Sequence, residues 1–298
     1  MSVIVSTKNN RITIPFVLDS IRRLSKQYIV ELIVVDGMSD DGTYQFAANF
    51  LAQFKNDFYN VKLLRDPGTS LSLSRNMGFV HSTGDFLVFL DGDMILHPEF
   101  VENFGRVLSG EYDAIAPRLE VLRLERFTSI FNAFIDVVSE GELNLNKPSI
   151  IPQARIFSRR ALSKIHGYPP LSRYFGEDRC ATALATIQGM KYVYMPTLRI
   201  IKVDEPSFAA YLRKHMRYGE GIEKDLTSGG RRVLRDYIVL RRLTYLNLIA
   251  PLLSMLYALR LLRVSRSAGL ADFLSVFTMK YTIDLAMLIG EIKGLIKH

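Results

Sequence analysis

Two aspartates in Asp91-Gly92-Asp93 follow Phe86 to Leu90, the most apolar strand that the sequence predicts. In open parallel sheets, ligands bind beyond the carboxyl ends of the strands, so these carboxylates are placed for a divalent cation and a polyphosphate. Their hard oxygen atoms suit Mg²⁺ or Mn²⁺. An Asp-x-Asp pair is also common in solvated turns, and the pattern alone leaves both interpretations open.

Further polar motifs lie before and after this pair. Asp36 follows another apolar run, Glu31 to Val35, and so places a second acid at the end of a predicted strand. The other motifs follow one another along the chain: Ser39-Asp40-Asp41-Gly42-Thr43, Ser74-Arg75-Asn76-Met77-Gly78, Ser82-Thr83-Gly84-Asp85 and Phe175-Gly176-Glu177-Asp178. Each motif is unspecific alone, and the information lies in the ordered set.

As an ordered set, the motifs resemble those of the inverting family-2 glycosyltransferases with a GT-A fold. The resemblance covers roughly residues 1 to 220. It implies a Rossmann-like, mostly parallel α/β sheet that binds a nucleotide-diphosphate sugar, a GDP- or UDP-sugar with GDP-mannose among the candidates. It also implies a metal-dependent sugar transfer that uses Mn²⁺ or Mg²⁺.

The resemblance assigns the donor site to residues at the strand ends. Asp36 would contact the nucleotide base, and the backbone of Ser6 and Thr7 after the first strand would form the other wall. Asp91 would hold the ribose or assist the metal, and Asp93 would ligate the metal that bridges the diphosphate. A cation at that point stabilises a departing nucleoside diphosphate, which is what sugar transfer requires.

The remaining matches concern charge compensation at the donor site, the acceptor and the metal. Arg75 would order the acids and neutralise charge. Asp178 would act as the general base towards an acceptor hydroxyl, with Glu177 beside it, because a buried carboxylate with a raised pKa can take up a proton. An inverting transfer is a single in-line displacement and needs no enzyme nucleophile. Lys202 stands where many relatives place a histidine that reaches the metal, which leaves a third protein ligand open.

These residues require a sheet whose strands end side by side. Apolar runs rich in Val and Ile predict strands, and runs that are apolar on both faces suit strands covered by helices on both sides. The predicted strands are Val3 to Val5, Glu31 to Val35, Val61 to Leu64, Phe86 to Leu90, Ala114 to Ala116 and Tyr192 to Met195. Helix starts are predicted at Thr13 and between Ser39 and Thr43. The sequence therefore predicts an α/β catalytic domain over residues 1–205.

Composition and charge exclude several classes of protein. The chain has 298 residues, of which 48% are hydrophobic and 23% are charged. This composition is typical of a folded protein and excludes a disordered chain or a polytopic membrane protein. The single cysteine, Cys180, excludes an internal disulfide and fits a reducing compartment. The net charge is +8, and the whole excess lies in residues 206–298, which hold 15 basic and 7 acidic residues. A basic nucleic-acid-binding module would explain this charge but neither the ordered acids nor the apolar tail, so no nucleic-acid partner is expected.

The C-terminal part predicts an attachment to a membrane. Residues 206–242 are typical of basic amphipathic interface helices, and residues 243–298 hold two apolar segments, Leu243 to Leu259 and Phe273 to Ile292. The catalytic domain would then lie on the cytoplasmic side and act on a hydroxyl of a lipid-linked glycan. A polyprenyl-phosphate acceptor is the alternative, and the sequence leaves open whether the apolar helices are transmembrane or lie on the bilayer.

One motif of this part extends the resemblance. Lys214-His215-Met216-Arg217-Tyr218 occupies the place where cellulose-synthase-like members have Gln-x-x-Arg-Trp, in a minimal version of their membrane arrangement. The match implies that Arg217 lies near the diphosphate and that Tyr218 is a platform for the acceptor sugar. Because Lys and Tyr replace Gln and Trp, a solvated basic helix face with one buried tyrosine is the alternative interpretation.

Overall fold

The computed structural model describes residues 1–122, 153–170, 177–203, 208–227 and 270–296, together with Leu252, Met255, Leu256 and Leu259. The chain divides into two compact units. The first consists of Met1–Glu120 and Pro152–Val203, and the second of Val121–Ile151 and Asp204–His298. The predicted domain boundary after residue 205 stays a prediction.

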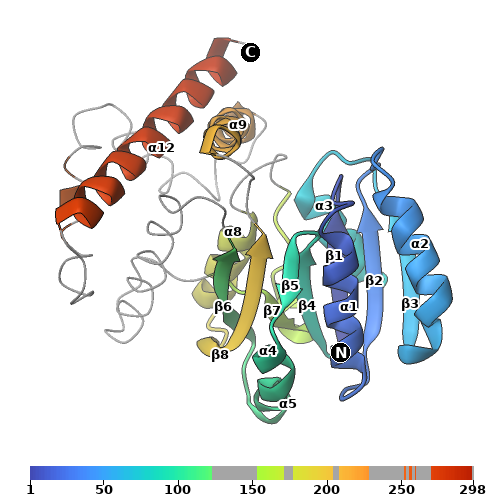
Figure 1. Ribbon diagram of the computed structural model, residues 1–298. Coiled ribbons are helices and arrows are strands. Elements are labelled where there is room, and N and C mark those ends of the chain that lie inside the picture. Colours follow the sequence, from blue (N-terminus) through green and yellow to red (C-terminus); the bar gives the residue numbers. More distant parts are fainter. Residues whose placement is uncertain are drawn as a thin grey trace. The chain divides into compact units, whose positions relative to one another are not determined.

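The first unit is built on a sheet with the strand order β3-β2-β1-β4-β7-β6-β8-β5 (Figure 1). The strands are β1 (Ser2–Thr7), β2 (Glu31–Asp36), β3 (Asn60–Arg65), β4 (Phe86–Asp91), β5 (Met94–Leu96), β6 (Ala114–Leu122), β7 (Ile156–Ser158) and β8 (Tyr192–Val203). The neighbours β3, β2, β1 and β4 run parallel, so their carboxyl ends meet at one edge. The predicted acids Asp36 and Asp91 are the last residues of β2 and β4.

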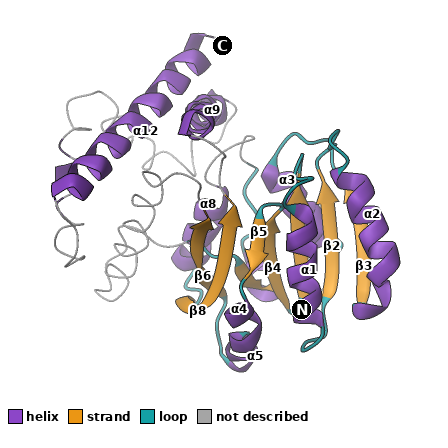
Figure 2. Cartoon of the chain, viewed as in Figure 1, coloured by secondary structure: helices purple, strands orange, loops and turns teal. Residues whose placement is uncertain are grey.

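Helices cover both faces of this sheet (Figure 2). They are α1 (Ile14–Ser25), α2 (Thr43–Phe54), the short 3₁₀ helix η1 (Lys55–Asp57), α3 (Leu71–Val80), α4 (Pro98–Asn103), α5 (Gly105–Ser109), α7 (Arg159–Lys164) and α8 (Glu177–Ile187). Successive side chains of a strand point to opposite faces, and the core is divided accordingly. Val3 and Val5 of β1 pack with α1, whereas Ile4 packs in a separate cluster with residues of α7 and α8.

The six predicted strands and both predicted helix starts are confirmed, but the expectation of a mostly parallel sheet is wrong. Strand β7 is antiparallel to β4 and to β6, and β5 is antiparallel to β8. The strands β5 and β7 have three residues each, too few to show a hydrophobic period. Apolar patterning also carries no information on strand direction, so the sequence could not separate a parallel from a mixed sheet.

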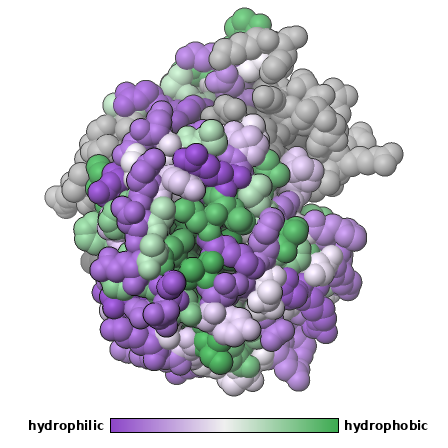
Figure 3. All heavy atoms as spheres, turned by 90° about the vertical axis from the view of Figure 1, so that its right-hand side faces the viewer, coloured by the Kyte–Doolittle hydropathy of each residue, from purple (hydrophilic) through white to green (hydrophobic). Residues whose placement is uncertain are grey.

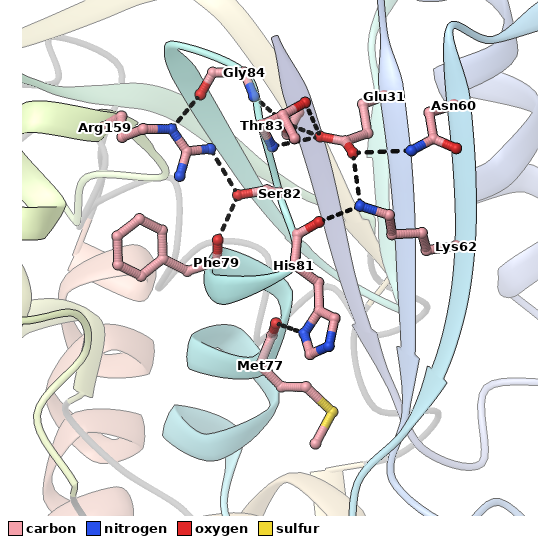
Figure 4. A network of polar contacts seen from close by, with 11 residues as sticks. Glu31, Asn60, Lys62, Met77, Phe79, His81, Ser82, Thr83, Gly84 and Arg159 are labelled. Atoms are coloured by element: carbon pink, nitrogen blue, oxygen red, sulfur yellow. Dashed lines mark hydrogen bonds and ion pairs between the residues drawn. The ribbon is translucent and has the colours of Figure 1, made fainter.

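A buried carboxylate joins the amino ends of the parallel strands. Glu31 at the start of β2 accepts hydrogen bonds from the Ser2 hydroxyl (2.6 Å) and from the Thr83 backbone (2.7 Å), and it pairs with Lys62 (3.2 Å) (Figure 4). Burial opposes its ionisation, but these donors outweigh burial and lower the pKa of Glu31 to about 2. The acid is therefore ionised at neutral pH and stabilises the sheet at the edge opposite the predicted site.

Strand β3 is the outer strand on one side of the sheet. Its side chains are half-buried or exposed, and Val61 and Leu63 pack only partly against the core. In the view from this side, apolar residues gather near the middle of the face among polar ones (Figure 3). Lys62 and Arg65 place charges on β3, a usual protection of an edge strand against pairing with a second sheet.

In the described part of the second unit, two long helices pack closely on each other. They are α9 (Phe208–Thr227) and α12 (Leu270–Ile296). A side chain on Gly219 would clash with the backbone of Met287, and one on Gly290 would clash with the backbone of Met216. The two glycines therefore allow the helix backbones to touch, a packing mode that requires residues without a side chain at the crossing.

Of the two apolar segments predicted in the tail, one is described by the structure and the other lies almost wholly outside the described residues. The segment from Phe273 to Ile292 is helical as part of α12. The segment from Leu243 to Leu259 and the basic residues 228–242 lie almost wholly outside the described residues. Within the described ranges, none of the helices combines the length and the apolar character that crossing a membrane requires.

Candidate active site

The ends of three parallel strands bring the predicted donor residues together. Pairing of β1 with β2 places Thr7 opposite Asp36, and pairing of β1 with β4 places Ser6 opposite Asp91. Neighbouring strands lie about 4.8 Å apart, so these residues form one cluster at the carboxyl edge of the sheet. Their roles in ligand binding stay predictions.

Asp36 is fully buried, and the described residues provide a hydrogen-bond donor for only one of its two carboxylate oxygens. Its Oδ2 accepts a hydrogen bond from the Ser39 backbone N–H at 3.0 Å, and the Arg65 guanidinium lies 3.9 Å away. Its Oδ1 and the Ser6 hydroxyl are buried without a hydrogen-bond partner among the described residues. A buried polar atom left unpaired costs about 1–3 kcal/mol, so both atoms suit a ligand that donates hydrogen bonds, such as a nucleotide base.

The turn between Asp91 and Asp93 is held by the end of β1 and by the residue before α1. The Gly92 N–H donates to the Ser6 carbonyl at 2.9 Å, and the Thr13 hydroxyl donates to the Gly92 carbonyl at 2.6 Å. A side chain at position 92 would clash with Thr7 Oγ1. Thr13 stands at the start of α1 as predicted, yet its hydroxyl binds this turn rather than capping the helix. The glycine is thus required to seat the two aspartates against β1.

Arg75 lies buried between two of the predicted acids. Its guanidinium donates to Asp91 Oδ1 at 2.8 Å and to Glu177 Oε1 at 2.6 Å, and its side chain is 1% exposed. Burial opposes the charge of Arg75, but these carboxylates outweigh it and raise its pKa further above the ordinary value. Arg75 therefore lies between two of the predicted acids, and its role in ordering them for a ligand stays a prediction.

A second buried arginine, Arg155, was not found from the sequence. It lies just before β7, 3.5 Å from Asp91 Oδ2 and 3.1 Å from Asp178 Oδ2. Its backbone is fixed on both sides, because the Phe89 N–H donates to its carbonyl and its own N–H donates to the Ile115 carbonyl. The only signal in the sequence is a single charge within an otherwise apolar run from Ala154 to Phe157.

Burial and neighbouring charges shift the pKa values of two acids in opposite directions. For Asp91, burial opposes ionisation, but Arg75, Arg155 and Lys202 outweigh it and hold its pKa well below the ordinary value. For Glu177, burial dominates over the attraction of Arg75 and raises the pKa. One acid of the cluster is therefore firmly ionised, and another is shifted towards taking up a proton.

Asp93, the second carboxylate of the pair, faces a lysine of β8. Both oxygens of Asp91 face arginines, whereas Asp93 Oδ2 faces the Lys202 ammonium at 3.7 Å. The described residues contain no group of three or more His, Cys, Asp or Glu side chains placed around one cation. A Mg²⁺ ion is commonly held by one or two carboxylates, phosphate oxygens and water, so Asp93 with Asp91 fits a metal that the diphosphate completes.

The motif Arg75-Asn76-Met77-Gly78 divides into three roles. Arg75 points to the acids, as described above. Asn76 binds the backbone of Tyr168 twice, at 2.7 and 2.8 Å, and Gly78 leaves room for Ile4 of β1. Tyr168 was also missed from the sequence: it is buried, its ring lies 5.1 Å from the Arg75 guanidinium, and it supports that guanidinium from one side.

Arg217 and Tyr218 belong to the second unit. Both lie on α9, where the Arg217 side chain is exposed and Tyr218 is half-buried with its ring against His215. The remaining predicted site residues, from Ser6 to Asp178, belong to the first unit. The predicted roles of Arg217 near a diphosphate and of Tyr218 as a sugar platform stay predictions.

Residues 2–165, more than half of the chain, match the profile of glycosyl transferase family 2. The chain belongs to this family. The matched segment contains the strand ends, the Asp-x-Asp turn and both buried arginines, so the predicted family is confirmed. The family match ends before Glu177, and the tail lies outside it.

Known relatives agree with this membership. The glycosyltransferase AglE of Haloferax volcanii is 27% identical over 199 residues, which are 64% of this chain and 62% of AglE, so the match spans less than two thirds of that relative. The mannosyltransferase PcManGT of Pyrobaculum calidifontis, solved with GDP-Man and Mn²⁺, has a TM-score of 0.62 at 18% identity, covering 99% of this chain and 86% of that chain. The structure of S. aureus TarS 1-349 with UDP-GlcNAc has a TM-score of 0.52 at 14% identity. The match covers 100% of this chain and 92% of that chain. These two structures share the GT-A-like α/β fold.

Proposed function

We propose that this family-2 chain is an inverting glycosyltransferase that moves a sugar from a nucleotide-diphosphate sugar to an acceptor hydroxyl. The observation that carries the proposal is the buried network in which Arg75 and Arg155 connect Asp91, at the strand ends, to Glu177 and Asp178, at the start of α8. It joins a donor-binding edge to two carboxylates that can serve the acceptor. Preorganised charges of this kind stabilise a transition state without rearrangement during the reaction.

Several residues of the candidate site have separate tasks in the proposed reaction. Asp36 Oδ1 and the Ser6 hydroxyl receive the nucleotide base, because they are buried and unpaired among the described residues. Asp178, held by Arg155 at 3.1 Å, accepts the proton of the acceptor hydroxyl during a single displacement at the sugar carbon. A Mn²⁺ or Mg²⁺ ion held by Asp93 and Asp91 would supply positive charge to the departing diphosphate.

The donor is proposed from chemistry and from the solved relatives. PcManGT was solved with GDP-Man and TarS with UDP-GlcNAc, so both guanine and uracil nucleotides are candidates for this chain, and GDP-mannose is one of them. Asp36 can accept a hydrogen bond from either base. A hydroxyl acceptor is favoured over a polyprenyl phosphate because a phosphate oxygen is already ionised and would not need Asp178.

Nucleotide binding tests this proposal directly. GDP, UDP, TDP and CDP are each added to the full chain with and without Mn²⁺, and the unfolding temperature is measured. A ligand that binds the folded state stabilises it by about 2.7 kcal/mol at a hundred times its dissociation constant, so at least one nucleotide should raise the unfolding temperature by several degrees. If all four leave it unchanged in both conditions, the donor site is absent and the proposal fails.

We further propose that the second unit docks on a membrane surface, with the catalytic unit on the cytoplasmic side and a lipid-linked glycan as acceptor. The support is the polarity of α12. Its acidic side chains Asp284 and Glu291 are buried, whereas Leu285, Ile289 and Ile292 on other faces are exposed. A helix that buries charge and exposes apolar side chains suits an apolar environment, and the exposed Arg213 and Arg217 of α9 suit anionic headgroups.

Flotation with lipid vesicles tests the membrane proposal. The full chain should float with vesicles that contain anionic lipid, and the double variant Ile289→Asp/Ile292→Asp should float much less, because each charge opposes insertion of the apolar face. The matched control is Ile29→Asp/Ile187→Asp, which adds the same charges at two side chains of the first unit that are 75% and 80% exposed. Equal flotation of the two double variants would contradict a role of α12 in membrane contact.

A further inference from the structure

A lysine near the end of strand β8 faces the Asp-x-Asp turn. Strand β8 is antiparallel to β5, and this register places Lys202 opposite Met94, the residue after Asp93. The backbone N–H of Val203 donates to the Asp93 carbonyl at 2.9 Å, which fixes the end of β8 against the turn. The Lys202 ammonium lies 3.7 Å from Asp93 Oδ2.

The positive charges around the two aspartates are divided between buried and accessible groups. Arg75 and Arg155 face Asp91, and their side chains are 1% and 6% exposed. Lys202 faces Asp93, and both of these side chains remain about one fifth exposed. A lysine ammonium is a compact charge on a flexible stem, so it can turn from a carboxylate to an incoming phosphate without a movement of the backbone.

We propose that Lys202 is a diphosphate-binding residue of the donor site and that it competes with a divalent cation for Asp93. This inference rests on the proposed function. Without a metal, Lys202 itself would compensate part of the negative charge of the donor's diphosphate. When a cation occupies Asp93, the ammonium is displaced towards the diphosphate and adds its charge to the stabilisation of the departing group. Nucleotide binding by this chain therefore needs a metal only in part.

The charges of the site support a role for both a metal ion and the Lys202 ammonium in binding the diphosphate. Asp91 is already compensated by two arginines, so the described protein groups leave mainly Asp93 as a metal ligand, and a cation held by so few protein atoms depends on the diphosphate itself. A protein cation at 3.7 Å from that ligand lowers the metal's advantage, because like charges repel at this distance. The same ammonium attracts the diphosphate whether or not a metal is bound.

The test is calorimetric binding of GDP and UDP, with GMP and UMP as ligands that lack one phosphate. Each is measured in EDTA and in Mn²⁺. Wild type should bind the better diphosphate in EDTA, more tightly than its monophosphate. Lys202→Ala should weaken this metal-free diphosphate binding by roughly tenfold or more, the usual loss for a hydrogen bond to a charged group, and leave monophosphate binding unchanged. Lys202→His replaces the ammonium by a metal ligand and should make diphosphate binding strongly dependent on Mn²⁺.

Two further variants complete the test. Lys191→Ala removes the same charge just before β8 begins, where Lys191 pairs with Glu111 at 2.7 Å, and should bind like wild type. Asp93→Ala removes the partner of Lys202 and should lose the increment due to Mn²⁺ while keeping or strengthening binding in EDTA. The inference is overturned if Lys202→Ala binds diphosphate in EDTA like wild type, or if Asp93→Ala abolishes binding in EDTA. If wild type binds no nucleotide in either condition, the proposed function fails and this inference fails with it.

Discussion

Asp178→Asn is expected to lower turnover by roughly 10²-fold or more while nucleotide binding stays close to that of wild type. The amide keeps the size of the side chain and one acceptor oxygen, but it cannot accept the proton of a hydroxyl. Arg155 loses one of its two carboxylates and keeps Asp91, so the fold should survive. Release of the nucleoside diphosphate from the donor measures turnover, and calorimetry measures binding.

The control for this variant is Asp19→Asn. Asp19 forms a half-exposed ion pair with Arg23 on α1, and the change removes the same charge without a contact to the candidate site. Its turnover should equal that of wild type. A near-normal rate of Asp178→Asn would show that the acceptor needs no base, and would favour the alternative acceptor, a polyprenyl phosphate whose oxygen is already ionised.

Glu31→Ala is expected to reduce the free energy of unfolding at neutral pH by about 2–3 kcal/mol. The change leaves the buried Ser2 hydroxyl and the Thr83 N–H without their acceptor and removes the counter-charge of Lys62. Because the folded pKa of Glu31 is about 2, below its ordinary value of 4.5, the contribution is fully present above that value and is lost as the pH falls towards 2. Urea unfolding at several pH values measures this dependence.

The matched control is Glu111→Ala, whose carboxylate pairs with Lys191 on the surface. An exposed pair contributes little, so this variant should unfold like wild type at neutral pH. The difference between wild type and Glu31→Ala should shrink between about pH 5 and pH 2. A loss that is small at neutral pH, or independent of pH, would contradict the role of the ionised Glu31.

The sequence by itself determined the family and the positions of the buried strands. Val3 to Val5, Glu31 to Val35 and Phe86 to Leu90 are apolar on both faces, and that pattern depends on local composition alone. Asp36 and Asp91 close such strands, so their meeting at one edge followed from the parallel arrangement. The ordered motifs added the expectation that Arg75 and Glu177 belong to the same site.

The tertiary structure alone decided two further contacts of the acids in the site. Arg155 is 64 residues from Asp91 in the chain, and only the pairing of β4 with β7 places it between Asp91 and Asp178. Lys202 reaches Asp93 only through the antiparallel register of β8 with β5, a strand too short to be recognised in the sequence. Strand direction and register depend on contacts between distant segments, which a local pattern of apolar and polar residues does not encode.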